Sequence, residues 1–192
     1  MTLGEDWTVN TPRSALLICV ALSVLLTDIG HAQGRPVEFG LDGAVSISRI
    51  DGVGGAGSSS AQTWAFPVQR ARVGVFPASR VQLQLAMGFS VADFGAVSTV
   101  RLTLGLATVY QMTGRDARSG LFASGGVALD LLSHNGSDVQ WTAGGGIGYR
   151  APLGDRLAFR PALEVGRSFG SKLRPGCTTV SGLVGLSFFT RS

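Results

Sequence analysis

Hydrophobic and polar residues alternate with a period of two along most of the chain after residue 36. Between residues 37 and 47 the odd positions are mostly large and apolar, whereas the even positions are small, polar or charged. Because successive side chains of a β-strand point to opposite faces, this period predicts a strand with one apolar face. Eight such segments occur, at residues 37–48, 63–76, 81–89, 100–107, 126–131, 139–150, 157–166 and 179–188.

The second of these segments changes phase part of the way along. Its even positions are apolar over residues 64–68, but its odd positions are apolar over residues 71–75. An extra residue in one strand of an antiparallel pair moves the following side chains to the other face. We therefore expect a β-bulge near Gln69, which places Arg70 and Arg72 on the face of small residues.

A short apolar segment precedes the predicted strands. Residues 15–26 are almost entirely apolar and are soon followed by Gly30-His31-Ala32. This arrangement is typical of a secretory signal peptide with a small-x-small cleavage site, and the apolar run is too short for a membrane-spanning helix. We expect a signal peptide at residues 1–32, cleaved after Ala32, and a barrel domain at residues 33–192. Cleavage removes Cys19 and leaves Cys177 without a partner for an internal disulfide.

The composition excludes several classes of protein. The chain has 28 glycines, only 15% charged residues and a net charge of +4, which is unlike a disordered protein. No run reaches the ~18 apolar residues that indicate a transmembrane helix. Arginines are scattered singly and Lys172 is the only lysine. We therefore expect no nucleic-acid partner, because such proteins carry clustered basic patches.

The composition of the two strand faces decides between a soluble barrel and a membrane barrel. A soluble barrel, such as a lipocalin, turns its apolar face inward and needs a well-hydrated outer face. Here the second face consists mostly of Gly, Ala, Ser and Thr, which suits the narrow interior of an eight-stranded barrel better than a solvated exterior. The pattern favours an all-β, eight-stranded antiparallel up-and-down transmembrane β-barrel with its apolar face toward lipid.

The predicted interior face carries a nearly balanced set of charges. An isolated charge is costly in a narrow lumen, so we expect arginine–carboxylate pairs that fill and plug the barrel. The lipid-facing positions carry no charge in the middle of any strand. The predicted lumen network consists of Glu38, Asp42, Arg70, Arg72, Arg101, Asp130, Arg150, Arg160 and Glu164.

Aromatic residues on the apolar face fall near the predicted strand ends. If both termini are periplasmic, one set lies at the periplasmic ends and a second set lies at the outer ends, as in the interfacial girdles of membrane barrels. The periplasmic set is Phe39, Tyr110, Tyr149, Phe159 and Phe188, and the outer set is Phe89, Trp141 and Phe169.

Two stretches of the sequence resemble a known family. Residues 144–150, 152–156 and 157–160 read GGGIGYR, PLGDR and LAFR, and residues 73–81 read VGVFPASRV. They are similar to the penultimate hairpin and the first periplasmic hairpin of small eight-stranded outer-membrane β-barrel proteins related to OmpA and OmpX. The resemblance implies the cell outer membrane as the location and the barrel-assembly machinery as a partner. In the family the last strand usually ends the chain on an aromatic residue, whereas here Thr190-Arg191-Ser192 follow Phe189.

Candidate chemistry is sparse. Some barrels of this kind are lipid A deacylases with His, Ser and Glu at the outer rim, but the single histidine left after cleavage, His134, lacks the His-x-Ser order of those enzymes. No spacing supports a metal site, and no cofactor is implied. Arg167, Lys172 and Arg174 lie near the predicted last outer loop. They are candidates for contact with lipopolysaccharide phosphates, or they form a solvated basic loop.

Together these patterns predict a non-enzymatic, monomeric barrel with a structural or surface-interaction role and a plugged lumen. Outer-membrane lipid and lipopolysaccharide are its expected partners. A narrow channel for small solutes is the alternative if the interior charges rearrange, and a lipid A-modifying enzyme is a more distant one.

Overall fold

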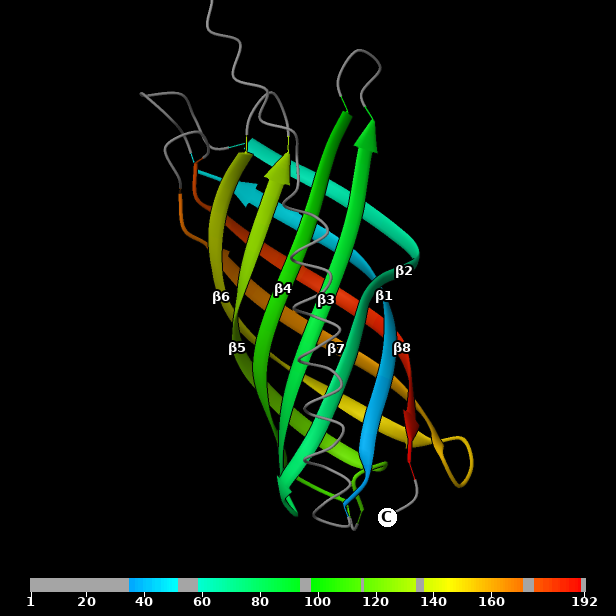
Figure 1. Ribbon diagram of the computed structural model, residues 1–192. Helices are drawn as coiled ribbons and strands as arrows, with labels where there is room; N and C mark the ends of the chain where they lie inside the picture. Colours follow the sequence, from blue (N-terminus) through cyan, green and yellow to red (C-terminus); the bar gives the residue numbers. More distant parts are fainter. Residues whose placement is uncertain are drawn as a thin grey trace, which may run out of the picture.

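The chain folds into a single closed β-barrel in a computed structural model that describes residues 35–51, 59–93, 98–114, 116–133, 137–170 and 175–190 (Figure 1). Each strand pairs antiparallel with its neighbours in sequence, and β1 closes the barrel on β8. The predicted fold class, with eight strands, is therefore confirmed. The strands are β1 (Val37–Ile50), β2 (Ser59–Ala78), β3 (Val81–Asp93), β4 (Ser98–Gln111), β5 (Gly120–Ser133), β6 (Ser137–Pro152), β7 (Leu157–Ser168) and β8 (Cys177–Phe189). The predicted signal peptide lies outside the described residues.

Both ends of the β1–β8 seam are held by hydrogen bonds. At the end of the barrel where β1 begins and β8 ends, which we call the terminal end, the Val37 N–H donates to Thr190 Oγ1 at 2.9 Å and the Thr190 N–H donates to the Val37 carbonyl at 2.9 Å. At the opposite end the Asp51 N–H donates to the Gly176 carbonyl at 2.9 Å. Thr190, which follows the last strand, therefore continues the pairing that closes the barrel.

The predicted bulge is present in β2. The β1–β2 register runs evenly to the pair Asp42 and Arg70 and resumes at the pair Ala44 and Ala65. Gly43 alone thus faces residues 66–69, so the irregularity is larger than the single extra residue that the phase slip predicted. It lies next to Arg70 and restores the phase that directs Arg70 and Arg72 into the barrel.

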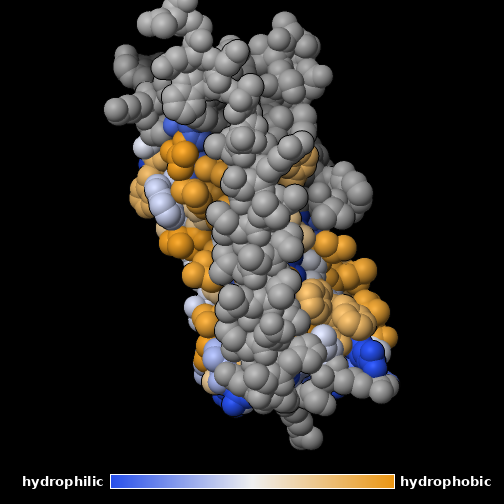
Figure 2. All heavy atoms as spheres, in the orientation of Figure 1, coloured by the Kyte–Doolittle hydropathy of each residue, from blue (hydrophilic) through white to orange (hydrophobic). Residues whose placement is uncertain are grey.

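The outer surface of the barrel is apolar. Large hydrophobic side chains remain exposed on the outward phase of the strands, with Ile47 at 59%, Ile147 at 61% and Leu163 at 51%. Figure 2 shows a broad hydrophobic zone over the visible strands, with hydrophilic residues gathered toward the two ends. Among the residues whose side chains the structure describes, the buried charged ones are Glu38, Asp42, Arg72, Asp130, Arg150 and Arg160. This distribution is the reverse of that in a soluble protein and is typical of a transmembrane barrel.

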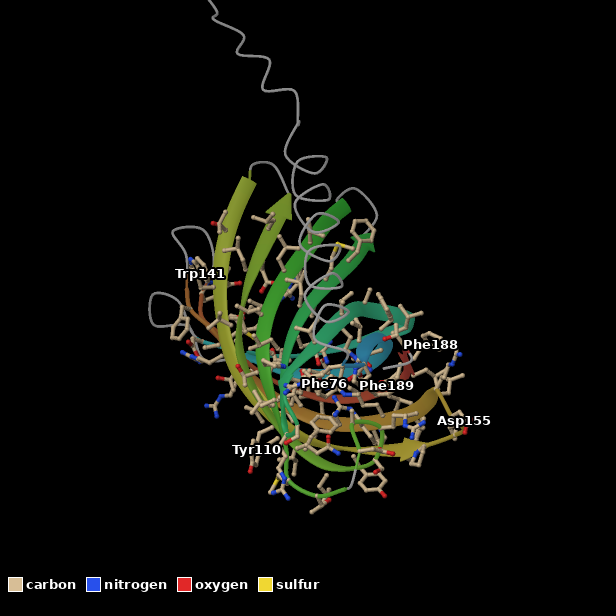
Figure 3. All side chains as sticks on the ribbon, turned by 60° about the horizontal axis from the view of Figure 1, so that its bottom comes forward. Phe76, Tyr110, Trp141, Asp155, Phe188 and Phe189 are labelled. Atoms are coloured by element: carbon tan, nitrogen blue, oxygen red, sulfur yellow. The ribbon has the colours of Figure 1, made fainter. Side chains whose placement is uncertain are left out.

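Aromatic residues lie on the outer surface at both ends. Tyr110 and Phe188 lie near the terminal end and Trp141 lies near the opposite one, and all three are at least 42% exposed (Figure 3). Within the described residues, no helix is long and apolar enough to cross a bilayer.

Compact turns join the strands at the terminal end. Two residues connect β2 to β3, and four connect β6 to β7. The longer β4–β5 turn is held by the Gln111 side-chain amide, which donates to the Asp116 carbonyl at 2.5 Å and also to the Ser119 carbonyl. Gly114 and Gly120 adopt φ values of 100° and 105° in this turn, a region that favours glycine.

Candidate functional site in the barrel lumen

The register of the barrel places charged residues from distant strands in one row. Asp42 on β1 is opposite Arg70 on β2 and Gly185 on β8, and Gly185 is in turn opposite Arg160 on β7. All of these positions have the inward phase. Three charged side chains that are far apart in the sequence therefore meet inside the lumen.

Glu38 is the first centre of this charged network. Its carboxylate accepts hydrogen bonds from Gln82 Nε2 at 2.7 Å, from Arg150 Nη2 at 2.8 Å and from Ser187 Oγ at 2.7 Å. Arg72 Nη1 donates to the same carboxylate. The side chains of Glu38, Arg72 and Arg150 are at most 1% exposed. Charge-assisted bonds to two guanidinium groups thus compensate the burial of this carboxylate.

Asp42 is the second centre. Its Oδ2 atom accepts from Arg72 Nε at 2.9 Å, from two nitrogens of Arg70 at 3.2 Å and from Arg160 Nη1 at 3.4 Å. Arg70 also binds Glu164 through two hydrogen bonds of 2.9 and 3.0 Å. The network formed by Glu38, Asp42, Glu164, Arg70, Arg72, Arg150 and Arg160 carries three negative and four positive charges when all groups are ionised.

Aromatic rings fill the space around the arginines at the terminal end. The Arg150 guanidinium lies 5.1 Å from the centre of the Phe122 ring and 5.9 Å from that of Phe76, and the Arg160 guanidinium lies 4.5 Å from that of Phe122. Phe76 contacts Phe189, with ring centres 6.5 Å apart, inside the strands (Figure 3). Cation–π contacts thus stabilise guanidinium groups that are buried. Together with the ion pairs, these rings close the lumen.

Sequence reasoning missed these aromatic residues and Gln82. It selected only charged side chains on the inward phase. Phe76 has the same parity as Arg72, and Phe122 has the same parity as Asp130, so the signal that marked the charges also marks these rings.

Glycines on neighbouring strands make room for the long side chains. A Cβ atom at Gly40 would collide with the Arg72 guanidinium, and one at Gly148 would collide with the Phe122 ring. A Cβ atom at Gly185 would meet the Asp42 carboxylate and the Leu41 carbonyl. The small residues of the inward face are therefore the surfaces across which Arg72, Phe122 and Asp42 extend.

A second, separate ion pair lies on the opposite wall. Arg101 donates to the Asp130 carboxylate through Nε at 3.0 Å and Nη2 at 2.7 Å. Thr103 Oγ1 at 2.5 Å and Thr142 Oγ1 at 3.1 Å donate to the same carboxylate. The structure thus brings seven of the nine sequence-predicted lumen residues into one network and places the other two, Arg101 and Asp130, in a pair of their own.

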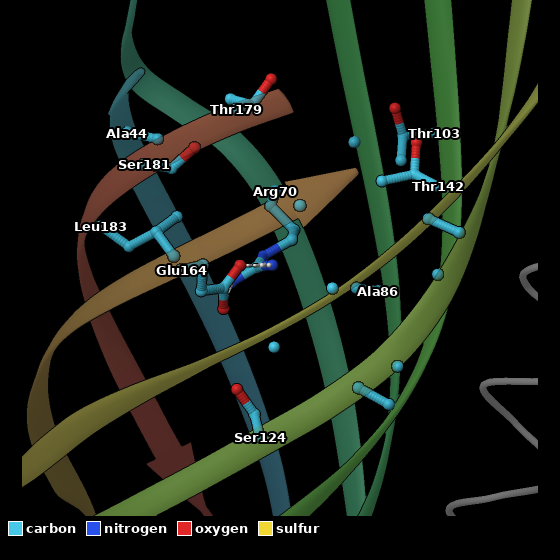
Figure 4. A pocket seen from close by; sticks show the side chains of 18 of the residues that line it. Ala44, Arg70, Ala86, Thr103, Ser124, Thr142, Glu164, Thr179, Ser181 and Leu183 are labelled. Atoms are coloured by element: carbon cyan, nitrogen blue, oxygen red, sulfur yellow. Dashed lines mark hydrogen bonds and ion pairs between the residues drawn. The ribbon is translucent and has the colours of Figure 1, made fainter. Parts of the chain in front are cut away.

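A cavity lies next to this network, in the part of the lumen that extends from the network to the barrel end opposite the terminal end. The cavity has a volume of about 300 Å³, and its charged and amide lining residues are Arg70, Gln84, Arg101, Arg160 and Glu164. Figure 4 shows Arg70 and Glu164 bound to each other in this cavity. Its walls are otherwise mostly small residues and hydroxyl side chains, among them Ser46, Ser48, Thr103, Ser124, Thr142, Ser168, Thr179 and Ser181. The side chains of Arg70 and Glu164 remain 22% and 24% exposed here, unlike the buried groups around Glu38.

The candidate lipopolysaccharide-binding residue that the structure describes, Arg167, is engaged in an ion pair. Its Nη1 donates to Asp51 Oδ1 at 3.0 Å and its Nη2 donates to Asp51 Oδ2 at 2.5 Å, linking the ends of β7 and β1. The hydrogen bonds from Arg167, reinforced by its charge, lower the pKa of the Asp51 carboxyl. Lys172, Arg174 and His134 lie outside the described residues, so the structure does not place them.

No cluster with the composition of a metal site is found in the part of the chain that the structure describes. Cys177 is a free thiol there and lies 3.6 Å from Thr179 Oγ1. What the lumen can do chemically therefore rests on ion pairs, hydroxyl groups and the cavity.

Comparison with known proteins supports the fold. No protein-family model matches the chain, and no curated protein is similar to it in sequence. Among solved structures, Neisserial surface protein A superposes with a TM-score of 0.60 at 8% identity, covering 79% of this chain and 96% of that protein. AlkL superposes with a TM-score of 0.53 at 14% identity, covering 82% and 90%. The N-terminal β-barrel domain of Pseudomonas aeruginosa OprF gives 0.51 at 17% identity, covering 80% and 97%. The chain has the fold of the small eight-stranded outer-membrane β-barrel proteins, as its resemblance to the OmpA and OmpX barrels predicted.

Proposed function

We propose that this protein is a monomeric barrel of the bacterial outer membrane with a structural or surface-interaction role and a lumen closed to solutes. Its terminal end faces the periplasm and its opposite end faces outward. The observation that carries the proposal is the network around Glu38, because side chains that are at most 1% exposed fill the lumen there. A closed, apolar-surfaced barrel suits residence in lipid and offers no continuous path for transport.

The proposed partners are outer-membrane lipid, lipopolysaccharide and the barrel-assembly machinery. Arg167 is exposed at the outward rim and has the guanidinium geometry that binds phosphate. Lipopolysaccharide phosphate would have to compete with Asp51 for Arg167. Because the groups are exposed, we expect added salt to screen and weaken the contact between Arg167 and phosphate. A triple change of Arg167, Lys172 and Arg174 to alanine that left salt-sensitive lipopolysaccharide binding intact would contradict the contact.

Membrane fractionation and electrophoretic mobility test the location and the fold together. We expect the protein in the outer-membrane fraction, with a gel mobility that changes on boiling because the barrel resists unfolding by detergent. A soluble chain whose mobility is the same with and without boiling would overturn the proposal.

Conductance separates a closed barrel from a narrow channel. In planar bilayers we expect no single-channel steps from the purified protein, because rearrangement of the network would break several buried ion pairs at once. Regular conductance steps would favour the channel.

We assign no enzymatic activity to the protein. Loss of lipid A trimming in a His134→Ala variant would contradict that assignment.

A further inference from the structure

The cavity in the outward half of the lumen borders on the charged network, and we call this side of the cavity its floor. An arginine with unused hydrogen-bond donors, Arg160, lies there. Arg160 contacts this cavity, yet its side chain is only 1% exposed. Its Nε and Nη2 atoms have no hydrogen-bond partner among the described residues, and its Nη1 makes one long contact of 3.4 Å with Asp42. A buried guanidinium with unused donors is costly, and an anionic group within reach would remove that cost.

The local charge favours the same kind of occupant. The network beneath the cavity has one more arginine than carboxylate. Only Glu164 and Arg70 of this network are partly exposed, and they are bound to each other. A single negative charge in the cavity would balance the network without displacing any of its ion pairs.

The walls provide neutral hydrogen-bonding groups above that floor. The Oγ atoms of Ser46 and Ser181 form a hydrogen bond of 2.8 Å. On the same side of the lumen, Ser48 Oγ and Thr179 Oγ1 form another of 2.8 Å. Each hydroxyl can both donate and accept, so such pairs retain capacity for a hydroxylated ligand. The buried Gln84 Oε1 atom, also at the cavity, lacks a partner within the described part of the chain and offers an acceptor.

We propose that the outward half of the lumen binds a small hydroxylated anion, a molecule with one carboxylate or phosphate group and several hydroxyls. The anionic group would receive hydrogen bonds from Arg160, and the hydroxyls would bind the serine and threonine side chains of the wall. A volume of about 300 Å³ lies at the lower end of the range for small-molecule sites. The ligand is held at a closed floor and does not pass through the barrel.

Calorimetric titration of the purified protein in detergent micelles tests this proposal with gluconate as the probe. Sorbitol, which has similar size and hydroxyl groups but no charge, is the matched ligand control. We expect gluconate to bind and sorbitol not to bind at the same concentrations. Equal binding of the two ligands, or no binding of gluconate up to millimolar concentrations, would overturn the proposal.

Two variants locate the site. Arg160→Gln removes the guanidinium whose Nε and Nη2 donors are unused, and Gly105→Leu places a leucine side chain in the cavity while leaving every charge in place. A Cβ atom at Gly105 makes only ordinary contacts, the closest at 3.6 Å from Ala128 Cβ, so the backbone tolerates the change. We expect each variant to raise the Kd for gluconate at least tenfold. If Arg160→Gln fails to fold, the Gly105→Leu result decides.

Control variants make equivalent changes elsewhere. Arg80→Gln removes one positive charge from the exposed β2–β3 turn, and Gly182→Leu adds the same bulk at a position where nothing lies within 4 Å of a Cβ atom. Both should bind gluconate like the unchanged protein. Unchanged binding in Gly105→Leu would overturn the site while leaving the proposed membrane role untouched, since that role is read from fractionation and mobility.

Discussion

At the scale of single residues, Glu38 shows how the lumen tolerates buried charge. It accepts hydrogen bonds from Arg72, Arg150, Gln82 and Ser187 and is fully buried. Glu38→Gln would keep the shape but leave the buried Arg150 guanidinium without a carboxylate and the buried Arg72 guanidinium with Asp42 alone. We expect a loss of about 3 kcal/mol in the free energy of unfolding, measured by urea titration in lipid vesicles.

Glu164→Gln is the matched control for Glu38→Gln. The Glu164 side chain is 24% exposed, and its partner Arg70 keeps a second carboxylate in Asp42. The loss should stay near 1 kcal/mol or less. Equal losses in the two variants would mean that burial does not set the strength of these pairs.

Glycine at position 185 is required by the path of the Asp42 side chain. An added Cβ atom there meets both the Asp42 carboxylate and the Leu41 backbone. We expect Gly185→Ala to lower the free energy of unfolding by about 1–3 kcal/mol, the usual cost of overpacking. Gly182→Ala, on the same strand with open space around it, should be neutral or slightly stabilising. The same urea titration compares the two, and a neutral Gly185→Ala would show that Asp42 has another path.

The sequence predicts which face a residue lies on, but not its height in the barrel. Parity alone placed Asp42, Arg70 and Arg160 inside. That they meet depends on the register across β8, which sets Gly185 between Asp42 and Arg160. The same register separates Asp130 from this group. Strand register arises from the whole closed sheet, so a single segment does not contain it.

At the scale of strands, the alternation predicted each element, but it shortened several of them. β5 begins at Gly120, whereas the pattern suggested residue 126. The residues before Gly126 keep the same parity, but Phe122 places a large apolar side chain on the inward face, which weakens the contrast between the faces. Pairing with β4, as in Gln111 with Phe122, extends the strand where the pattern is faint. The bulge in β2 was visible because it inverted the phase of strongly apolar residues.

The ends of β1 and β7 are linked by Asp51 and Arg167, and this link depends on pH. The pKa of Asp51 lies below its ordinary value of 3.8 in the folded protein because Arg167 donates to the carboxylate. The link therefore contributes stability above pH 3.8 and loses it as the pH falls through the lower folded value. We expect Arg167→Gln to raise the pKa of Asp51, read from the side-chain carboxyl carbon shift in an NMR titration.

Asp116 is the internal reference for that titration. Partial burial acts to raise the pKa of Asp116, but hydrogen bonds from Arg118 act to lower it. The net result is a pKa below the ordinary value. Since Asp116 lies in the β4–β5 turn at the other end of the barrel, its pKa should not respond to Arg167→Gln. A shift of both carboxyls would indicate a general change in the fold instead of the loss of one link.

At the scale of the whole molecule, lipid around the apolar face would make the cost of an added charge depend on its depth in the bilayer. Val127 is 51% exposed near the middle of β5, and Val139 is 49% exposed near the outward end of β6. In a membrane barrel, arginine costs about 2–4 kcal/mol at the bilayer midplane and about 0–1 kcal/mol near an interface. We therefore expect Val127→Arg to be the more destabilising of the two by about 2 kcal/mol in urea titrations in lipid vesicles. Water around the barrel would make the two substitutions equally mild, since both side chains are equally exposed, and that result would contradict the membrane orientation of the entire outer surface.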